Sequence, residues 1–578
     1  MTETTRTVRA ADHLVEQLIQ QGVSHAYGVP GESYLPVLDA LYDRADDIQF
    51  ITCRQEGGAA MAADAHARLT KRPGVCFVTR GPGATNASAG VHIAYQDSTP
   101  LILFIGQVAR DMIEREAFQE IDYRRMFGPM AKWVAQIDDA SRLQEYISRA
   151  FRVALSGRQG PVVLALPEDM LYDEFVAPPA ARFIDAPLMS PDDSSMERLQ
   201  ASLLAARNPM VIVGGGGWNQ GGMDALAAWV EQLQLPVAAS FRCQSLLDNN
   251  HPNYIGHFSV GRTPYLDNAA KDADLIVCVG ARLGEITTGG YALFSTPVPE
   301  QNLVHVYPSG EELGRVYEPH IGIVSDVNSF CKSAVRWAEQ GSTTNDTEGD
   351  TTNGMEGSTT SATAGSRAQN IALRSTVIKT LRVEFEKNNS ASSVPGDGLA
   401  QMFNHMNKVL PENAIVCNGA GNYAAWLHRF YRFRHSESQL APTSGSMGFG
   451  LPAAVAAAVV RPEREVFAIA GDGCFLMNSQ ELATVIHHGL SLTLVIINNA
   501  RYGTIRAHQE REYPQRMSGT ELTNPDFIQY GKAYGAGTAR VNTFDEFKLA
   551  LANARESGGL QLIEISQDRA ILAPGKPL

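Results

Sequence analysis

Short apolar runs alternate with longer stretches of small and polar residues along most of the chain. In the first part the runs are bounded by glycine and proline, and the stretch 56–70, EGGAAMAADAHARLT, separates two of them. Continuous apolar runs are typical of strands buried on both faces of a parallel sheet, and the stretches between them predict helices. The expected strands are 25–31, 48–54, 74–83, 100–107 and 160–167. This alternation predicts an α/β fold with a doubly wound parallel sheet.

The same alternation returns twice more, so we predict three doubly wound parallel-sheet domains. They cover residues 1–180, 190–338 and 395–578. A chain of 578 residues is too long for one hydrophobic core, which agrees with this division. Residues 339–366 are rich in Ser, Thr and Gly and lack an apolar period, so they predict a flexible linker. The amphipathic residues 367–390 predict a linker helix.

One strand–helix–strand unit in the third block, residues 463–499, carries polar residues at its strand ends. The first strand ends in Gly471-Asp472-Gly473 and the second ends at Asn499. Crossovers between parallel strands are right-handed, so both carboxyl ends lie at one sheet edge, where ligands of open α/β sheets bind. A carboxylate and an amide oxygen suit Mg²⁺, and glycines let the backbone approach a phosphate. The unit predicts a Mg²⁺–diphosphate site, and a turn without chemical role is the alternative.

Between these two strands, residues 478–489 carry apolar side chains at helical spacing. We expect Asn478 or Ser479 to cap the start of this helix and Gly489 to end it.

Composition and charge narrow the class of protein. Apolar content of 44% and charged content of 19% are typical of a globular protein. A net charge of −14 disfavours a nucleic-acid or anionic-membrane partner. The seven cysteines show no paired spacing, which argues against a zinc site or a disulfide framework. No apolar run is long enough to span a membrane and no signal peptide is visible, so we expect a cytoplasmic protein.

A single acid stands at the start of the Ala- and Gly-rich helix of the first block. Glu56 follows a buried strand directly and opens the helix 56–70. An acid in so apolar a setting is able to share its proton with a ligand. The alternative is a glutamate that only interacts favourably with the helix dipole.

Five segments occur in a characteristic order and spacing. They are RQEGGAAMAADAHAR (54–68), GPGATN (81–86), GQVARDMIEREAFQE (106–120), GSMGFGLPAA (445–454) and GDG…NN (471–499). In these segments the chain resembles the thiamine-diphosphate enzymes of the acetolactate synthase (acetohydroxyacid synthase) group. The resemblance covers essentially the whole chain outside residues 340–366. It implies an N-terminal domain that binds the pyrimidine ring of the cofactor and a C-terminal domain that binds its diphosphate.

The resemblance assigns the metal site. Asp472 and Asn499 would bind Mg²⁺ through their side chains, and the carbonyl oxygen of Arg501 would be a third ligand. Gly471 and Gly473 would lie against the diphosphate.

The resemblance also implies that the cofactor lies between two subunits of a homodimer or homotetramer. Glu56 of one subunit would hydrogen-bond the pyrimidine ring of a cofactor held by the other. Met447 would keep the two cofactor rings folded together, and the Gly445 carbonyl would fix the exocyclic amine. An ordinary core methionine is the alternative for Met447.

The implied activity is that of a carboligase. Such an enzyme decarboxylates pyruvate or a related 2-oxo acid and transfers the two-carbon unit to a second 2-oxo acid. Gln119 would contact the reacting acid, and Lys132 aligns with a position at the substrate channel. Either side chain could instead be a polar residue without a role in the reaction.

The chain departs from this family at the acceptor pocket. Acetolactate synthases usually carry a tryptophan where this chain has His508, so the identity of the second substrate is open. Another thiamine-diphosphate decarboxylase or C–C lyase is therefore an alternative function. A catalytically inactive cofactor-binding scaffold is an alternative from another class, although the presence of Glu56 argues against it.

The central domain carries two turns that resemble those facing FAD in this group. Gly215 and Gly217 lie in the first turn and Arg282 lies in the second. Tyr307 stands where the family usually has an acid, and a glycine-rich turn is a weak signal by itself. The sequence leaves the binding of FAD open.

Overall fold

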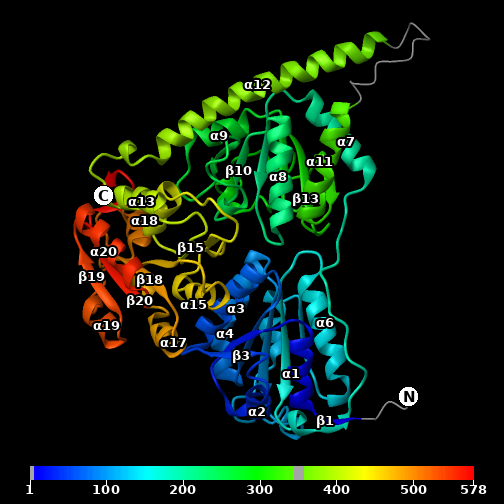
Figure 1. Cartoon of the computed structure of the whole chain (residues 1–578), viewed down its shortest axis with the longest axis vertical. Helices are drawn as coiled ribbons and strands as arrows, with labels where there is room; N and C mark the ends of the chain where they lie inside the picture. The colour runs from blue at the N-terminus through cyan, green and yellow to red at the C-terminus, as the bar shows by residue number, and fades with distance from the viewer. Residues whose placement is uncertain (1–5, 344–356, 578) are drawn as a thin grey trace. The chain divides into compact units, whose positions relative to one another are not determined.

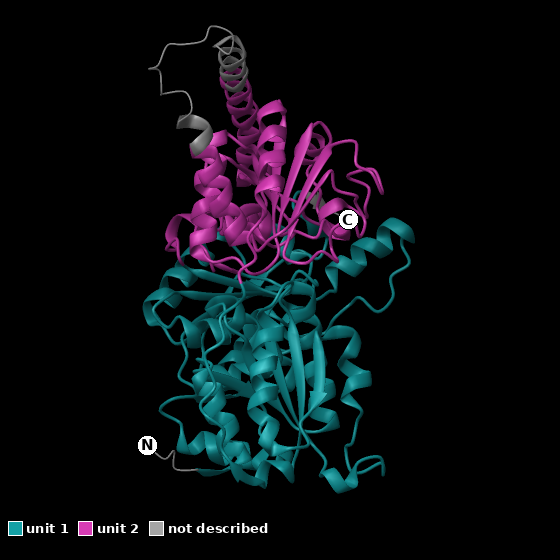
Figure 2. Ribbon diagram, turned by 90° about the vertical axis from the view of Figure 1, so that its right-hand side faces the viewer, with its two compact units in different colours: residues 1–187, 414–426, 440–578 teal, residues 188–413, 427–439 magenta. Residues whose placement is uncertain are grey.

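The structure is a computed structural model that describes residues 6–343 and 357–577 (Figure 1). The chain divides into two compact units (Figure 2). Unit 1 holds residues 1–187, 414–426 and 440–578, and unit 2 holds residues 188–413 and 427–439. Three six-stranded sheets form the cores of these units, which confirms the predicted α/β fold with three doubly wound sheets.

The first sheet belongs to unit 1, and all its strand pairs are parallel. In spatial order its strands are β3 (Gln49–Thr52), β2 (His25–Gly28), β4 (Gly74–Val78), β5 (Leu101–Gln107), β7 (Pro161–Pro167) and β6 (Trp133–Gln136). The helices of this block are α1 (Ala10–Gln20), α2 (Leu35–Asp43), α3 (Glu56–Thr70), α4 (Gly81–Asp97), α5 (Tyr123–Phe127) and α6 (Leu143–Leu155). An antiparallel pair, β1 (Thr7–Arg9) and β8 (Glu174–Val176), joins the two ends of the block. The winding direction reverses between β2 and β4, and ligands of such sheets bind at this switch point.

The third sheet lies mainly in unit 1 and repeats this order. Its strands are β16 (Gln439–Leu440), β15 (Ile415–Asn418), β17 (Val466–Gly471), β18 (Leu492–Asn498), β20 (Leu560–Ser566) and β19 (Gly537–Val541). Its helices are α14 (Tyr423–Phe430), α15 (Gly450–Val460), α16 (Asp472–Phe475), α17 (Leu482–His487), α18 (Gly503–Glu512), α19 (Phe527–Ala533) and α20 (Phe544–Ser557). A short pair, β21 (Ile571–Ala573) and β22 (Lys576–Pro577), follows. The switch point of this sheet lies between β15 and β17.

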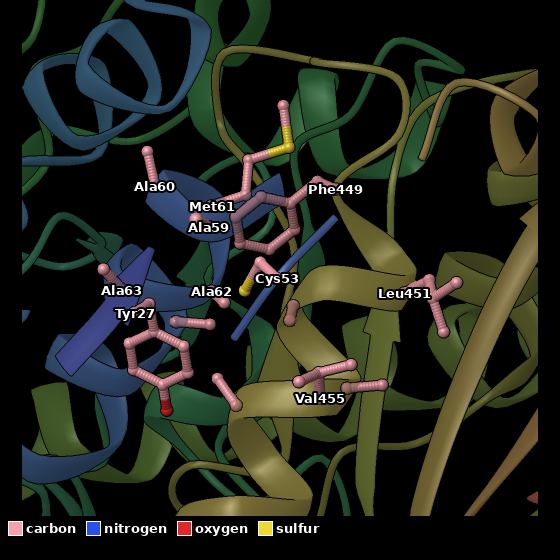
Figure 3. Packing of buried hydrophobic residues seen from close by; sticks show 14 of the residues in the cluster. Tyr27, Cys53, Ala59, Ala60, Met61, Ala62, Ala63, Phe449, Leu451 and Val455 are labelled. Atoms are coloured by element: carbon pink, nitrogen blue, oxygen red, sulfur yellow. The ribbon is translucent and has the colours of Figure 1, made fainter. Parts of the chain in front are cut away.

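Helix α3 packs against α15 inside unit 1, and its small residues allow the close approach (Figure 3). The helix begins at Glu56, as the sequence predicts, because the Gln55 side chain accepts the N–H of Gly58 at 2.9 Å. Alanines of α3 share one buried hydrophobic cluster with Phe449 and Val455. Burial on this scale stabilises the unit by roughly 25 cal/mol for each Å² of apolar surface removed from water.

Helix α3 also buries an acid. Asp64 is fully buried, and Arg68 Nη1 lies 3.9 Å from its carboxylate. Burial raises the pKa of Asp64 to about 7, and the negative charge of Asp97 adds to this rise. The unfolded chain holds this proton only below about pH 4. The contribution of Asp64 to stability therefore falls as the pH rises from about 4 to about 7, and it stays low above that.

We expect Asp64→Asn to raise the thermal unfolding midpoint by a few degrees at pH 8 and by much less at pH 5. The amide has no ionised form, so the variant avoids the cost of placing a charge in an apolar site. That cost is about 1.4 kcal/mol for each unit of pKa shift. Unfolding curves of the parent and variant at both pH values measure the difference. Asp43→Asn, at an exposed position of α2, is the matched control and should show no such pH dependence. An equal shift at both pH values would contradict this assignment.

The chain between β17 and β18 corrects one prediction. Instead of one helix over 478–489, it forms α16, a 3₁₀ turn at Ser479–Glu481, and then α17. Asn478 makes no capping hydrogen bond: its Oδ1 accepts from Gln480 Nε2 at 3.3 Å, and its Nδ2 donates to the Gly448 carbonyl at 3.0 Å. The hydroxyl of Ser479 hydrogen-bonds that of Tyr530 at 2.9 Å. Both capping candidates are thus used in tertiary contacts.

Unit 2 is built on the second sheet, whose strand pairs are all parallel. Its strands are β11 (Tyr254–His257), β10 (Val237–Ala239), β9 (Pro209–Val213), β12 (Leu275–Val279), β13 (Asn302–Tyr307) and β14 (Ile321–Val324). Its helices are α7 (Asp193–Ala205), α8 (Gln220–Leu233), α9 (Pro264–Lys271), α10 (Glu285–Thr288), α11 (Val327–Thr343), α12 (Gly357–Asn389) and α13 (Gly398–Val409). Numbered along the chain, the strand order is 3-2-1-4-5-6, which is typical of dinucleotide-binding folds.

Helix α12 contains most of the predicted linker helix 367–390 and begins before it. Of the predicted linker 339–366, residues 344–356 lie outside the described residues, and its flanks belong to α11 and α12. The predicted domain boundaries themselves stay predictions.

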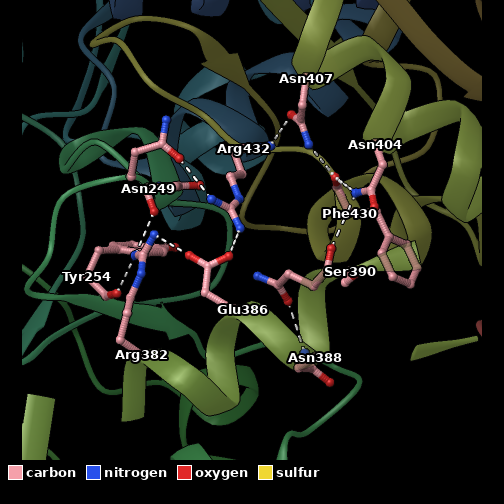
Figure 4. A network of polar contacts seen from close by, with 12 residues as sticks. Asn249, Tyr254, Arg382, Glu386, Asn388, Ser390, Asn404, Asn407, Phe430 and Arg432 are labelled. Carbon is pink, nitrogen blue, oxygen red and sulfur yellow. Dashed lines mark hydrogen bonds and ion pairs between the residues drawn. The ribbon is translucent and has the colours of Figure 1, made fainter. Parts of the chain in front are cut away.

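A polar network holds α12 within unit 2 (Figure 4). Arg382 Nη1 donates to the carbonyl oxygens of Asn249 and Tyr254 at 2.8 Å each. Glu386, one turn further along α12, pairs with both Arg382 and Arg432.

Nowhere in the described parts of the chain does a helix combine the length and the apolar character needed to cross a bilayer.

Candidate active site

The carboxyl ends of β17 and β18 lie side by side, as predicted. The strands pair in parallel with Gly471 opposite Ile497. Asp472 follows β17 as the first residue of α16, and Asn499 follows β18. Their exposed fractions are only 2% and 4%. The two predicted metal ligands, with the flanking Gly471 and Gly473, are therefore brought together at one sheet edge.

The Asp472 carboxylate is oriented by a neighbour that sequence reasoning missed. Asn524 Nδ2 donates to Asp472 Oδ2 at 2.7 Å and to Asn498 Oδ1 at 3.0 Å. Asn498 Nδ2 donates in turn to Glu564 Oε1 at 2.8 Å. Burial raises the pKa of Asp472, and the Asn524 hydrogen bond opposes this rise. A bound cation would offset the cost of burying this charge.

The two neighbouring asparagines point to different partners. Asn498 belongs to the network around Glu564, whereas Asn499 Oδ1 accepts the N–H of Arg501 at 3.1 Å. The Arg501 side chain forms an ion pair with Glu521 at 2.9 Å. A metal contact from Arg501 would therefore come from its carbonyl oxygen, as the family resemblance implies.

Three polar atoms at this edge are buried without a hydrogen-bond partner in the described part of the chain. They are Asn418 Oδ1 at the end of β15, Asn422 Nδ2 in the loop that follows, and Ser444 Oγ. The amide N–H and the hydroxyl are donors that suit phosphate oxygens. Buried donors without a partner can bind the oxygens of a diphosphate, and the buried carboxylate of Asp472 can bind its cation. Both lie beside the switch point of the sheet.

The predicted ring-binding loop is bonded to the segment that follows Asp472. The Gly448 N–H donates to Cys474 Sγ at 3.3 Å, and the Gly448 carbonyl accepts from Asn478. Gly445 is exposed with φ of +68°, in the left-handed region that favours glycine. Met447 is half-buried.

The start of this loop is held by the N-terminal block of the same unit. Asp97 Oδ1 accepts the Thr443 N–H at 2.8 Å as well as its hydroxyl. Arg68 Nη1 donates to the Ala441 carbonyl at 3.0 Å and to Asp97 Oδ2 at 3.2 Å. The half-buried Arg68 of α3 and the buried Asp97 of α4 therefore fix the loop that leads to Gly445.

Glu56 stands at the carboxyl edge of the first sheet. It opens α3 immediately after the turn that follows β3, and it is half-buried. Its Oε2 accepts from Asn86 Nδ2 on α4 at 2.9 Å. The predicted proton-sharing acid is thus oriented by a neutral donor.

Gln119 and Lys132 have different surroundings. The Gln119 carbonyl accepts the N–H of Gly81, the first residue of α4, at 2.9 Å, and its backbone is left-handed with φ of +67°. Lys132 Nζ donates to the carbonyl oxygens of Val153 and Ser156 at 2.5 Å each, at the end of α6. Burial lowers the pKa of Lys132 to about 8. These contacts give Lys132 a structural role, and its contact with substrate stays a prediction.

His508 lies on the exposed face of α18. Arg511, one turn further along the helix, lies with Nη2 2.7 Å from His508 Nδ1. A guanidinium has no acceptor atom, so Arg511 is the donor in this contact.

The candidate FAD residues lie in unit 2, on both sides of its switch point. Gly215 and Gly217 follow β9, and Arg282 lies in the turn after β12. Gly215 has φ of +73°, and a Cβ there would lie 2.0 Å from the Gly280 carbonyl oxygen, so only glycine fits. Tyr307, at the end of β13, is buried. A dinucleotide strand order with glycine turns at the switch point fits the adenine dinucleotide part of FAD.

Sequence reasoning missed Asn422, Asn478, Asn524 and Glu481 as residues of this site. Asn422 stands in a turn, Asn478 in a bend and Asn524 in an irregular loop, where asparagine is common for backbone reasons alone. Glu481 lies in a stretch of helical pattern, and nothing in its sequence surroundings indicates its contacts.

Models of the thiamine pyrophosphate enzymes match the chain in three places. The N-terminal TPP binding domain matches residues 8–126, the central domain residues 196–333, and the C-terminal TPP binding domain residues 419–565. Together with the three sheets and the Asp472–Asn499 edge, these matches define an enzyme that depends on thiamine pyrophosphate, which is another name for thiamine diphosphate.

Curated relatives narrow the group further. The chain is 30% identical to the acetolactate synthase isozyme 2 large subunit of Escherichia coli over 565 residues, covering 97% of this chain and 96% of that protein. It is 31% identical to the probable acetolactate synthase large subunit of Methanocaldococcus jannaschii over 579 residues, covering 99% and 94%. The Corynebacterium glutamicum acetolactate synthase large subunit is 29% identical, covering 94% of this chain and 84% of that protein. The chain belongs to the acetolactate synthase large-subunit family of thiamine pyrophosphate enzymes.

Proposed function

We propose that this protein is a thiamine-diphosphate-dependent carboligase of the acetolactate synthase type. It decarboxylates pyruvate or a related 2-oxo acid and transfers the two-carbon unit to a second 2-oxo acid. The observation that carries the proposal is the sheet edge with the buried Asp472 and Asn499, beside buried hydrogen-bond donors that lack a partner and suit phosphate oxygens. The chain is also similar to acetolactate synthases over nearly its full length. Thiamine diphosphate would supply an electron sink for the pair of electrons that stays behind when the C–C bond breaks and carbon dioxide leaves.

The protein residues hold the cofactor and move a proton. Asp472, Asn499 and the Arg501 carbonyl would bind Mg²⁺, and Gly445 and Met447 would contact the cofactor rings. Asn86 occupies Glu56 Oε2, so we assign to Glu56 Oε1 the proton that is shared with the pyrimidine ring. Gln119 would orient the reacting acid.

We propose a homodimer or homotetramer in which Glu56 serves a cofactor bound by the adjacent subunit. Exposed apolar side chains beside the candidate residues support such a contact, among them Phe118 next to Gln119 and Ile505 on α18. Light scattering coupled to size-exclusion chromatography measures the mass in solution, and a monomer that is fully active would exclude the proposal.

A cytoplasmic location stays a prediction.

The central test is an assay of the purified protein with pyruvate, Mg²⁺ and thiamine diphosphate. We expect acetolactate or a mixed acetohydroxy acid, identified by mass spectrometry. The carboligase proposal fails if none forms with any acceptor 2-oxo acid.

His508 favours a second candidate, a decarboxylase or C–C lyase on the same scaffold. A polar imidazole in place of an aromatic wall changes what the acceptor pocket holds. Release of carbon dioxide and aldehyde without a ligated product would support this candidate.

Replacing His508 by Trp is expected to shift the choice of acceptor toward larger aliphatic 2-oxo acids. An apolar wall distinguishes acceptors that differ by one methylene by about 10-fold or more. Product ratios from a competition between pyruvate and 2-oxobutyrate measure the shift. His320→Trp, at an exposed position in unit 2, is the control and should leave the ratio unchanged.

We propose that unit 2 binds FAD through the turns that contain Gly215, Gly217 and Arg282. The strand order of its sheet and the position of both turns at the switch point support the proposal. The visible absorption spectrum of the purified protein tests it, since a bound flavin gives a yellow protein and its absence after reconstitution would exclude the site.

A further inference from the structure

We propose that Glu481 is a positioning residue for Glu56. Glu481 lies in the C-terminal block of the same chain, and it holds the turn that directly precedes Glu56 and sets the direction of that side chain. The inference rests on the proposed role of Glu56. It concerns a residue that contacts neither the metal edge nor the substrate positions named above.

The Glu481 carboxylate binds the backbone directly before Glu56. Its exposed fraction is 1%. Glu481 Oε1 accepts the N–H of Arg54 and the N–H of Gln55, each at 3.1 Å. Its Oε2 accepts the Thr484 hydroxyl at 2.6 Å. Two successive N–H groups of the turn therefore point at one buried acid more than four hundred positions away.

Two further side chains of the same helix face complete the contact. His488 Nε2 accepts the Thr52 N–H at 3.1 Å, and Thr484 Oγ1 lies 3.3 Å from the Thr52 carbonyl oxygen. Glu481, Thr484 and His488 are spaced three and four residues apart, so they share one face of α17 and its flanks. This face holds the end of β3 and the turn up to Gln55.

The turn is the element that sets the direction of Glu56. The Gln55 side chain caps α3, so a fixed Gln55 backbone also fixes the first residue of the helix. A Cβ at Gly58 would lie 2.8 Å from Glu481 Oε1, so the glycine leaves room for the carboxylate. The geometry of Glu56 therefore depends on the Glu481 carboxylate through two backbone hydrogen bonds and one cap.

A charged acceptor holds the two N–H groups of the turn more tightly than a neutral one. Burial raises the pKa of Glu481, because the ionised carboxylate carries a desolvation cost at this position. Three hydrogen bonds to the carboxylate offset this cost, and each is stronger than a bond to a neutral acceptor. The resulting rigidity lies directly beside a residue whose placement has to be accurate, since an error of about 1 Å can cost 100-fold in rate.

The test compares Glu481→Ala with Glu481→Gln. We expect Glu481→Ala to lower kcat by about 10–100-fold, because the turn loses its anchor and Glu56 its direction. The Mg²⁺–cofactor affinity, measured by calorimetry on the purified protein, should change less than about 3-fold, because the Asp472 edge is untouched. Glu481→Gln should restore most of kcat, since its Oε1 can accept both N–H groups and its Nε2 can donate to Thr484.

Amide hydrogen exchange provides a readout that does not depend on turnover. Exchange at Arg54 and Gln55 should become faster in Glu481→Ala and stay slow in Glu481→Gln. Glu556→Ala, at an exposed position of α20, is the control and should change neither quantity.

Four outcomes would overturn the inference. The first is faster exchange in Glu481→Ala with kcat within about 3-fold of the parent. The second is an equal loss of cofactor affinity and kcat, which would indicate a general structural role. The third is a parent enzyme without any 2-oxo acid activity, which rejects the proposed function itself. Unchanged exchange would instead reject the anchor while leaving the proposed function intact.

Discussion

Glu56→Gln is expected to lower kcat for acetolactate formation by about 100- to 10,000-fold. The amide has nearly the same shape, and its oxygen can still accept from Asn86, but it cannot hold or release a proton. The cofactor should still bind, because the metal edge at Asp472 is unchanged. Steady-state rates at saturating Mg²⁺ and cofactor measure the loss, and turnover equal to that of the parent would reverse the assignment.

The loss has to be specific to this acid. Glu145→Gln, at an exposed position of α6, makes the same chemical change away from the sheet edge and should leave kcat unchanged. Cofactor affinity should be measured on Glu56→Gln as well, since a large loss of binding would indicate that Glu56 acts in holding the cofactor more than in proton transfer.

The second large effect is expected from Asp472→Ala, which should weaken Mg²⁺-dependent cofactor binding by more than about 100-fold. Loss of an outer hydrogen-bond partner of a metal ligand typically costs about 10–100-fold, and loss of a ligand itself should exceed that. The variant also leaves the Asn524 amide without its carboxylate partner. Calorimetric titration with Mg²⁺ and thiamine diphosphate measures the affinity.

The matched control is Asp568→Ala, which removes a carboxylate that caps a turn just beyond β20. It should bind the cofactor like the parent. Cofactor affinity of Asp472→Ala within about 3-fold of the parent would remove Asp472 from the metal site.

The sequence predicts several strands and helices nearly to the residue. The expected strand 100–107 is β5 at Leu101–Gln107, and the expected helix 56–70 is α3 at Glu56–Thr70. Continuous apolar runs between glycines and prolines leave few alternatives in a parallel sheet. The Asp472–Asn499 edge follows from the same reasoning, because a right-handed crossover places both strand ends together.

Contacts between distant segments could not be predicted in this way. Glu481 contacts Arg54, and Asn524 contacts Asp472, yet the sequence around each side chain is explained fully by a helix or a loop. The helix expected over 478–489 is interrupted because Asn478 and Ser479 bond to other elements. Local periodicity reports on burial, and it holds no information on which polar group a side chain meets in the folded chain.

Several site residues keep the status of predictions. The structure shows the loop that contains Gly445 and Met447 bonded to the segment after Asp472, which agrees with a role at one site. The roles of Gln119 and His508 depend on where a substrate lies, and the contacts of Lys132 point to the end of α6. Product analysis of variants at these positions is the direct way to decide.

The first and third sheets share one strand order, which reads 2-1-3-4-6-5 when each is numbered along the chain, although their sequences show no obvious repeat. Strand order is set by how a sheet and its covering helices pack, so it can be the same where the side chains differ throughout. The two predicted acids, Glu56 and Asp472, accordingly lie at corresponding carboxyl ends of two sheets with the same winding.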